Sequence, residues 1–372
     1  MALRYADAIT WDPTRADDAL WAQLTQHFTE PELVELGFLV GVLCGGQRWI
    51  HTLDLRHGDV ATESKTGYRP ELAEKKPMRT TQLTIAPTGM RLHEWIALER
   101  GYFQAHGIEP IVRWDIVSGI MSSWQGKAYK ERPQDLPFVG AAEPVDVINH
   151  CAWGSVCNAG AGLGKFVPDA YGVARWAIYV KPDSPIRRPE DLADVPIAVG
   201  MRAGSHFNVP YRLEEYLPLE RIKTVNVGGF GARLTALLNY EVEATSLLDP
   251  QISMADQLGL RRVIGNTFKT LWVVPPAANR ATLDAYFRVL QQADADLQRD
   301  PASCLPLWRY SIPTEFKDHQ WDFRRFDPGE RFFYAPLECD EFEEILEAAE
   351  RWGLDDYMRS RSFEELALHV GI

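Results

Sequence analysis

"AYGVARWAIYVKP", residues 170–182, is a long run of β-branched, aromatic and small apolar residues. A second run of this kind, "KTLWVVPP", covers residues 269–276. Both are typical of extended, buried strands. One complete set of alternating strands and helices lies between them. This layout predicts two α/β lobes joined by two crossing strands, with the second lobe (178–272) inserted into the first (82–177 and 273–372).

Shorter apolar runs alternate with helical patterns on both sides of these strands. The predicted strands cover residues 83–87, 108–114, 145–149, 196–200, 222–228 and 242–248, and a helix over 90–107 follows the first of them. From about residue 280 the pattern is mainly helical. Strands separated by 10–15-residue helices indicate βαβ units and a mostly parallel sheet. In such a sheet, a ligand is expected in the cleft beyond the carboxyl ends of the strands.

The pattern of the first 60 residues predicts a small helical appendage. The composition of residues 61–81 predicts a polar linker. Thr29 is a plausible N-cap, because Glu32 follows three residues later, and Leu33, Leu36, Val40 and Leu43 recur at helical spacing. Two glycines, Gly45 and Gly46, weaken this helix. The segment from residue 61 is charged and poor in large apolar residues.

Composition restricts the function. The 372 residues carry a formal net charge of −13, which argues against nucleic acid as a partner. The five cysteines form no CxxC pair, so we expect reduced thiols, no metal site and no cofactor. The opening residues lack the apolar core of a signal peptide, which predicts a cytoplasmic protein unless the true start lies upstream.

Four stretches resemble the periplasmic-binding-protein-like superfamily, type II. They are "HEWIALERGYFQAHGIE" (93–109), "VDVINHCAWGSV" (145–156), "YVKPDSPIRRPEDLADVPIAVGMRAGSHF" (179–207) and "VEATSLLDPQISMADQLG" (242–259). The closest branch is that of the nitrate, sulfonate and thiamine-pyrimidine-precursor binding proteins of ABC transporters. The resemblance covers nearly three quarters of the chain. It implies a two-lobe fold that closes on a small ligand, and an ABC permease as a partner if the chain is exported by another route.

The N-terminal appendage resembles a different group of protein families. "ELVELGFLVGVLCGGQRWIHTLDL" (32–55) looks like the C-terminal helices of carboxymuconolactone-decarboxylase and AhpD-like proteins. Those families use a CxxH pair, whereas Gly45, Gly46 and Gln47 follow Cys44 here, so no chemistry is carried over. A helical segment for oligomerisation or docking is the expectation.

The turn at 202–206 is the first candidate ligand site. Gly204, Ser205 and His206 open a helix directly after a strand, where free N–H groups and the helix dipole favour an anion, and Arg202 can add a bidentate contact. The alternative is a plain N-cap by Ser205. His206 can equally be a half-buried histidine bonded to backbone.

Three further strand ends supply candidate ligand contacts. Thr88, Gly89 and His93 follow the first strand, His150 and Trp153 follow another, and Asp249 ends a third. Trp153 can stack on a planar ligand, and His150 can donate or accept a proton. A nucleophilic pair of His150 with Cys151 is disfavoured, because neighbouring residues on a strand face opposite ways. For Asp249 we favour an N-cap, with Pro250 in the first helical turn.

Three hypotheses of function follow. The first is a solute-binding-like protein for a small, polar organic molecule that we expect to be anionic: a sulfonate, a carboxylate or a heterocycle. The second is a cofactor-independent decarboxylase or hydrolase that uses His150, His206 or Asp249 as acid or base. The third is a module that self-associates or binds a partner through its N-terminal helices.

Overall fold

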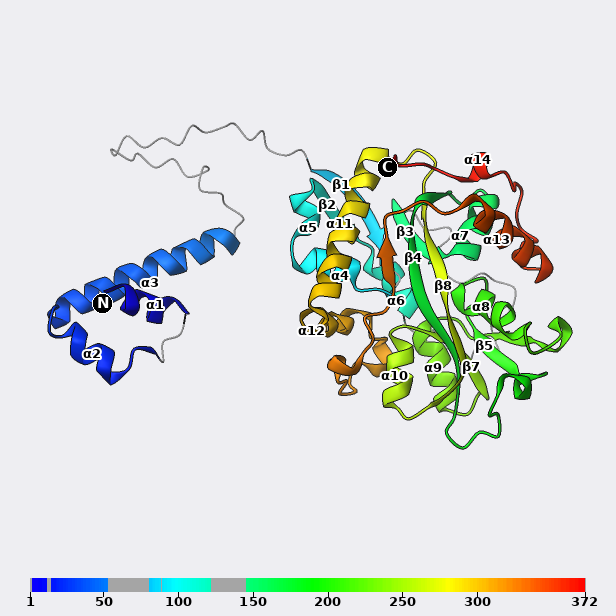
Figure 1. Cartoon of the computed structure of the whole chain (residues 1–372), viewed down its shortest axis with the longest axis horizontal. Coiled ribbons are helices and arrows are strands. Elements are labelled where there is room, and N and C mark those ends of the chain that lie inside the picture. Colours follow the sequence, from blue (N-terminus) through cyan, green and yellow to red (C-terminus); the bar gives the residue numbers. More distant parts are fainter. Residues whose placement is uncertain (1, 12–14, 53–79, 88, 122–144, 372) are drawn as a thin grey trace. The chain divides into compact units, whose positions relative to one another are not determined.

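The computed structural model describes residues 2–11, 15–52, 80–87, 89–121 and 145–371. The chain divides into two units, Met1–Pro77 and Met78–Ile372 (Figure 1). Most of the predicted linker 61–81 lies outside the described residues. Among the described helices, none has the length and apolar content that a membrane span requires.

The described residues of the smaller unit form the helices α1 (Ala2–Trp11), α2 (Asp18–Leu24) and α3 (Glu30–Thr52). The Asp17 carboxylate accepts the Leu20 N–H at 2.8 Å and so caps α2. At the start of α3, the Glu32 carboxylate accepts the Thr29 N–H at 2.7 Å, as the capping pattern predicts. The helix continues through Gly45 and Gly46 to Thr52.

The larger unit is built on one sheet with the strand order β2-β1-β3-β8-β4-β7-β5-β6, and β9 pairs with β4. The strands are β1 (Thr81–Ala86), β2 (Ile108–Val112), β3 (Val147–Cys151), β4 (Lys165–Val180), β5 (Pro196–Val199), β6 (Lys223–Asn226), β7 (Ala244–Leu248), β8 (Arg261–Val274) and β9 (Arg331–Phe333). The βαβ neighbours pair parallel, as predicted: β1 with β2 and β3, and β5 with β6 and β7.

Two long antiparallel strands, β4 and β8, join the two lobes. They pair from Lys165 opposite Val274 to Val180 opposite Arg261. At one end β3 adds to β8, and at the other end β7 adds to β4. The prediction of two crossing strands is confirmed. However, β8 (Arg261–Val274) begins eight residues before the run 269–276.

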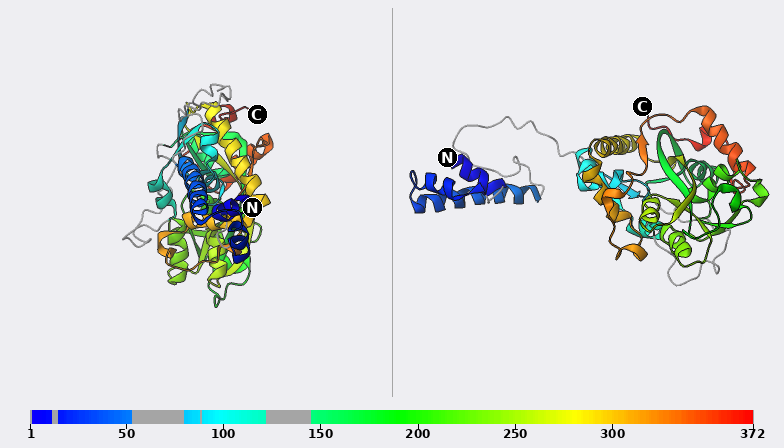
Figure 2. Two further views of the ribbon diagram at one scale, coloured as in Figure 1. Left: turned by 90° about the vertical axis from the view of Figure 1, so that its left-hand side faces the viewer. Right: turned by 60° about the horizontal axis from the view of Figure 1, so that its bottom comes forward.

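Helices pack on both faces of this sheet (Figures 1 and 2). They are α4 (His93–Glu99), α5 (Tyr102–Ala105), α6 (Trp114–Met121), α7 (Ala152–Gly160), α8 (Gly204–Leu213), α9 (Phe230–Leu238), α10 (Gln251–Gln257), α11 (Arg280–Arg299), α12 (Pro301–Cys304), α13 (Cys339–Arg351) and α14 (Phe363–Leu366). The helix predicted over 90–107 is divided, because Gly101 adopts a φ of 68° between α4 and α5. The C-terminal region is less helical than expected, since β9 pairs there with β4.

A buried charged cluster ties the start of α4 to the C-terminal region. The Arg91 Nε donates to Glu94 at 2.8 Å, and the Arg91 guanidinium lies 3.6 Å from Glu330. All three side chains are at most 2% exposed. Thr270 of β8 donates to Glu330 at 2.7 Å. Burial raises the pKa of the Glu330 carboxyl.

Candidate functional site

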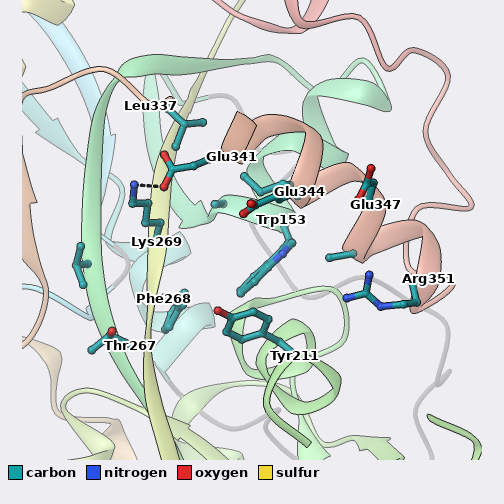
Figure 3. A pocket seen from close by; sticks show the side chains of 14 residues that line it. Trp153, Tyr211, Thr267, Phe268, Lys269, Leu337, Glu341, Glu344, Glu347 and Arg351 are labelled. Carbon is teal, nitrogen blue, oxygen red and sulfur yellow. Dashed lines mark hydrogen bonds and ion pairs between the residues drawn. The ribbon is translucent and has the colours of Figure 1, made fainter. Parts of the chain in front are cut away.

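A cavity of about 580 Å³ lies where both lobes meet the crossing strands. Its walls come from the start of α7, from α8, from β8 and from α13 (Figure 3). This volume is within the range of small-molecule sites, which is roughly 300–1,000 Å³. Of the residues singled out from the sequence, Trp153 alone lines this cavity.

Aromatic rings form one wall of the cavity. The Trp153 ring lies 5.0 Å from the Tyr211 ring and 6.4 Å from the Phe268 ring, centroid to centroid. In Figure 3 these three side chains point toward one another. Trp153 is 7% exposed and Tyr211 is 41% exposed, so Trp153 belongs to the core and Tyr211 offers an accessible ring face. Such a wall suits a planar ligand.

Charged side chains form the opposite wall. Glu341, Glu344 and Glu347 follow one another at three-residue spacing on α13, which places them near one face of the helix. Glu341 pairs with Lys269 of β8. Arg351 pairs with Glu214 through two hydrogen bonds, of 2.9 and 3.1 Å.

The two cations of this wall are therefore already neutralised. In the part of the chain that the structure describes, Glu344 and Glu347 make no hydrogen bond or ion pair. The cavity thus presents an aromatic face together with the carboxylates of Glu344 and Glu347, and Glu347 contributes to raising the pKa of Arg351. An anion that binds Lys269 or Arg351 would compete with Glu341 or Glu214 for that cation.

Polar groups of the turn before α8 already have hydrogen-bond and ion-pair partners within the chain. The Ser205 hydroxyl accepts the Gly200 N–H at 2.9 Å rather than capping its helix, whose N-cap is Ala203. Arg202 has a φ of 55°. Its guanidinium pairs with Asp356 at 2.7 Å and lies 4.0 Å over the Tyr357 ring. The predicted ligand contact of Arg202 is thus occupied by the chain's own carboxylate.

His206 is a neutral, hydrogen-bonded histidine. Its Nδ1 accepts the Arg202 N–H at 3.1 Å, so Nε2 carries the proton and lies 3.3 Å from the Thr224 hydroxyl. Burial lowers the pKa of His206 to about 4. It lines a second, smaller cavity of about 160 Å³, beside Thr224 and Trp352.

The turn before α8 contacts the turn before α7. A Cβ built on Gly204 would lie 3.4 Å from Cys151 Cβ and from the Phe268 ring. A Cβ on Gly154 would lie 3.6 Å from the Arg202 carbonyl oxygen. The turn that carries Arg202 and Gly204 thus lies beside the turn that carries His150 and Trp153.

His150 and Cys151 differ in their surroundings. The His150 Nε2 is buried and has no hydrogen-bond partner among the residues that the structure describes, and burial lowers the pKa of this imidazole to about 4. The Cys151 Sγ accepts the Gly154 N–H at 3.3 Å and caps α7. Burial raises the pKa of this thiol to about 12, so it is a poor nucleophile at neutral pH.

Among the described residues, the predicted contacts His93 and Gly89 do not line the cavity. His93 is fully buried, and its Nε2 lies 3.0 Å from the Asp294 carboxylate of α11. Gly89 is buried with a φ of 86°, and Thr88 lies outside the described residues.

The preferred interpretation of Asp249 as an N-cap is wrong. No side chain caps α10, and the Asp249 carboxylate instead receives two hydrogen bonds from Arg175 of β4, at 2.8 and 2.9 Å. Arg175 also contacts Asp327 at 2.9 Å, so one guanidinium joins the end of β7, a crossing strand and the C-terminal region. Sequence spacing gave no sign of a partner 74 residues away.

The sequence analysis missed most of the cavity wall. These residues are Tyr211, Phe268, Lys269, Glu341, Glu344, Glu347 and Arg351. One signal was present: the three glutamates recur at helical spacing in "CDEFEEILEAAER" (339–351). Nothing local, however, indicated that this helix would lie against α7, from which it is separated by about 180 residues.

No protein-family model matches the chain, and no curated protein matches it. Solved structures do. The alkanesulfonate-binding protein SsuA from Xanthomonas axonopodis pv. citri, bound to MOPS, is 15% identical with a TM-score of 0.54, over 77% of this chain and 98% of that one. The periplasmic aliphatic sulphonate binding protein SsuA from Escherichia coli is 14% identical with a TM-score of 0.55, over 76% and 95%.

A third similar structure is a conserved Candida albicans gene product that exhibits the generic periplasmic binding protein fold. It is 11% identical with a TM-score of 0.51, over 77% of this chain and 96% of that one. At these identities the similarity shows the fold alone. The chain has the type II periplasmic-binding-protein fold, with a small N-terminal helical segment added. The resemblance of residues 32–55 to AhpD-like helices stays a prediction.

Proposed function

We propose that this chain is a solute-binding protein that captures a small polar organic molecule in the cavity between α7, α8, β8 and α13. One observation carries the proposal: the cavity takes a ring from each lobe, Trp153 and Tyr211, and a third, Phe268, from a crossing strand. A ligand held there contacts both lobes and the strands that join them, which couples binding to their relative position.

Of the three ligand classes that the sequence suggested, a heterocycle fits this cavity best. The aromatic wall can stack on a planar ring. A sulfonate or a carboxylate, by contrast, finds Lys269 and Arg351 already paired with glutamates. Two of the named neighbours are sulfonate-binding proteins, so a comparison of charge classes is the decisive experiment.

The test is isothermal titration calorimetry with three planar probes of similar size: an aromatic sulfonate, an aromatic carboxylate and a heterocyclic amine. We expect the heterocyclic amine to bind most tightly to the full chain. The Tyr211→Ala variant should weaken this binding by about tenfold or more, because stacking on one ring is lost.

The matched control is Tyr216→Ala, since Tyr216 has a similar exposure, 38%, and lines neither cavity described above. Its affinity should equal that of the unmodified chain. Binding that is insensitive to Tyr211→Ala would refute the proposed site. A probe recovered chemically changed would instead support the enzyme hypothesis, with His150 and His206 as the first residues to replace.

A further inference from the structure

An exposed stripe of apolar side chains runs along α3 in the N-terminal unit. Val34, Phe38 and Val42 recur every four residues and are 67%, 72% and 51% exposed. Leu39 and Leu43 flank them at 56% and 57%. Five large apolar side chains on one helix are more than the scattered exposure of an ordinary surface.

The opposite side of α3 packs against the other helices of the unit. Leu33 packs with Leu20 and Leu24, and these three form the buried apolar cluster of the unit's described residues. Gly37 faces α1, where an added Cβ would lie 2.9 Å from the Tyr5 hydroxyl. A core of this size is small for an independently folded unit, and small units below about 70–80 residues commonly gain stability from oligomerisation or a similar addition.

We propose that the Val34–Phe38–Val42 stripe of α3 is a self-association surface, and that its occupant is α3 of a second copy in antiparallel orientation. Glu30, Glu32 and Glu35 lie at the start of the helix. Parallel pairing would place these carboxylates beside those of the other copy, whereas antiparallel pairing separates them and opposes the two helix dipoles.

The area is sufficient for such a pair. If each of the five side chains contributes roughly 100 Å², two copies bury about 1,000 Å² in total, the lower limit of a specific interface. A Cβ added to Gly41 would meet nothing within 4 Å, so this position beside the stripe leaves room for a second helix to approach. A membrane surface is a poorer partner, because a helix that begins with three glutamates is repelled by anionic lipid.

The first experiment is sedimentation of the full chain over a range of concentrations. We expect a monomer–dimer equilibrium, and the Phe38→Ser/Val42→Ser double variant should raise the dimer dissociation constant by on the order of a hundredfold. The control is Tyr240→Ser, which removes an equally exposed aromatic side chain, 72%, from the other unit and should leave the equilibrium unchanged. Circular dichroism of the double variant checks that its helices are retained.

The second experiment tests orientation by oxidative cross-linking. In an antiparallel pair centred on Phe38, Val34 of one copy lies beside Val42 of the other. A mixture of Val34→Cys and Val42→Cys chains should therefore give a mixed dimer, above the background from the native cysteines in unmodified chain. A chain that stays monomeric, or a dimer unaffected by Phe38→Ser/Val42→Ser, would overturn the proposal. Efficient Val34→Cys self-linking would overturn the antiparallel arrangement.

Discussion

Replacing Asp249 with asparagine should change how stability depends on pH. Asp249 is 1% exposed, and burial raises the pKa of its carboxyl from 3.8 to about 6, although Arg175 partly opposes the rise. A group with a raised pKa in the folded state stabilises the fold in its protonated form. That contribution is fully present below about pH 3.8 and is lost as the pH rises through about 6.

The pKa difference sets the size of the effect. A rise from 3.8 to about 6 corresponds to about 3 kcal/mol of stability lost by the unmodified chain between about pH 4 and pH 7. Asparagine mimics the neutral carboxyl and cannot ionise. The free energy of unfolding of Asp249→Asn, relative to the unmodified chain, should therefore increase by about this amount over the same interval.

Urea unfolding at a series of pH values measures this difference directly. The control is Asp194→Asn, because Asp194 forms a similar pair with Arg221 at 2.7 Å but is more than half exposed. Its effect should stay small at every pH. If the Asp249→Asn difference is flat with pH, or falls as the pH rises, the carboxyl does not titrate as its buried position requires.

Two further predictions concern buried groups. Arg91→Met leaves Glu94 and Glu330 buried without their cation and should lower the free energy of unfolding by about 3–5 kcal/mol in urea, and a loss below about 1 kcal/mol would contradict the buried pairing. Cys151 and Cys157 should resist alkylation in the native protein at mildly alkaline pH, because burial raises the pKa of each thiol to about 12. Mass spectrometry should find both modified only after unfolding, and rapid native labelling would contradict their burial.

The comparison for Arg91→Met is Arg212→Met, which breaks the pair between Arg212, in the last turn of α8, and the exposed Glu215 that follows this helix. That loss should stay within about 1 kcal/mol, because exposed pairs contribute little.

The fold could be predicted from the sequence because the two-lobe arrangement is visible in local patterns. Strand and helix periods alternate along the chain, and the runs around 170–182 and 269–276 stand out by their β-branched and aromatic residues. Local patterns also located the turn before α8. The break at Gly101 was missed, because a glycine within a helical pattern does not reveal whether it continues or ends the helix.

The candidate site was harder to predict because its walls come from distant segments. Trp153 was found since it follows a strand end, but Lys269 and Glu341 meet only after folding, 72 residues apart. Likewise, His93 and Asp249 looked available from their positions in the chain. Each instead has a charged partner, Asp294 or Arg175, that no spacing rule connects to it.

The pairing of Val180 with Arg261 has a practical consequence for engineering. Residues 181–260, which include β5, β6 and β7, follow β4 and precede β8 at paired positions, so this segment begins and ends at one place. The segment can be exchanged as one piece for the corresponding segment of another protein with this fold, whereas its deletion would remove β7 from its place beside β4. Such chimaeras would assign ligand preference to one half of the molecule or the other.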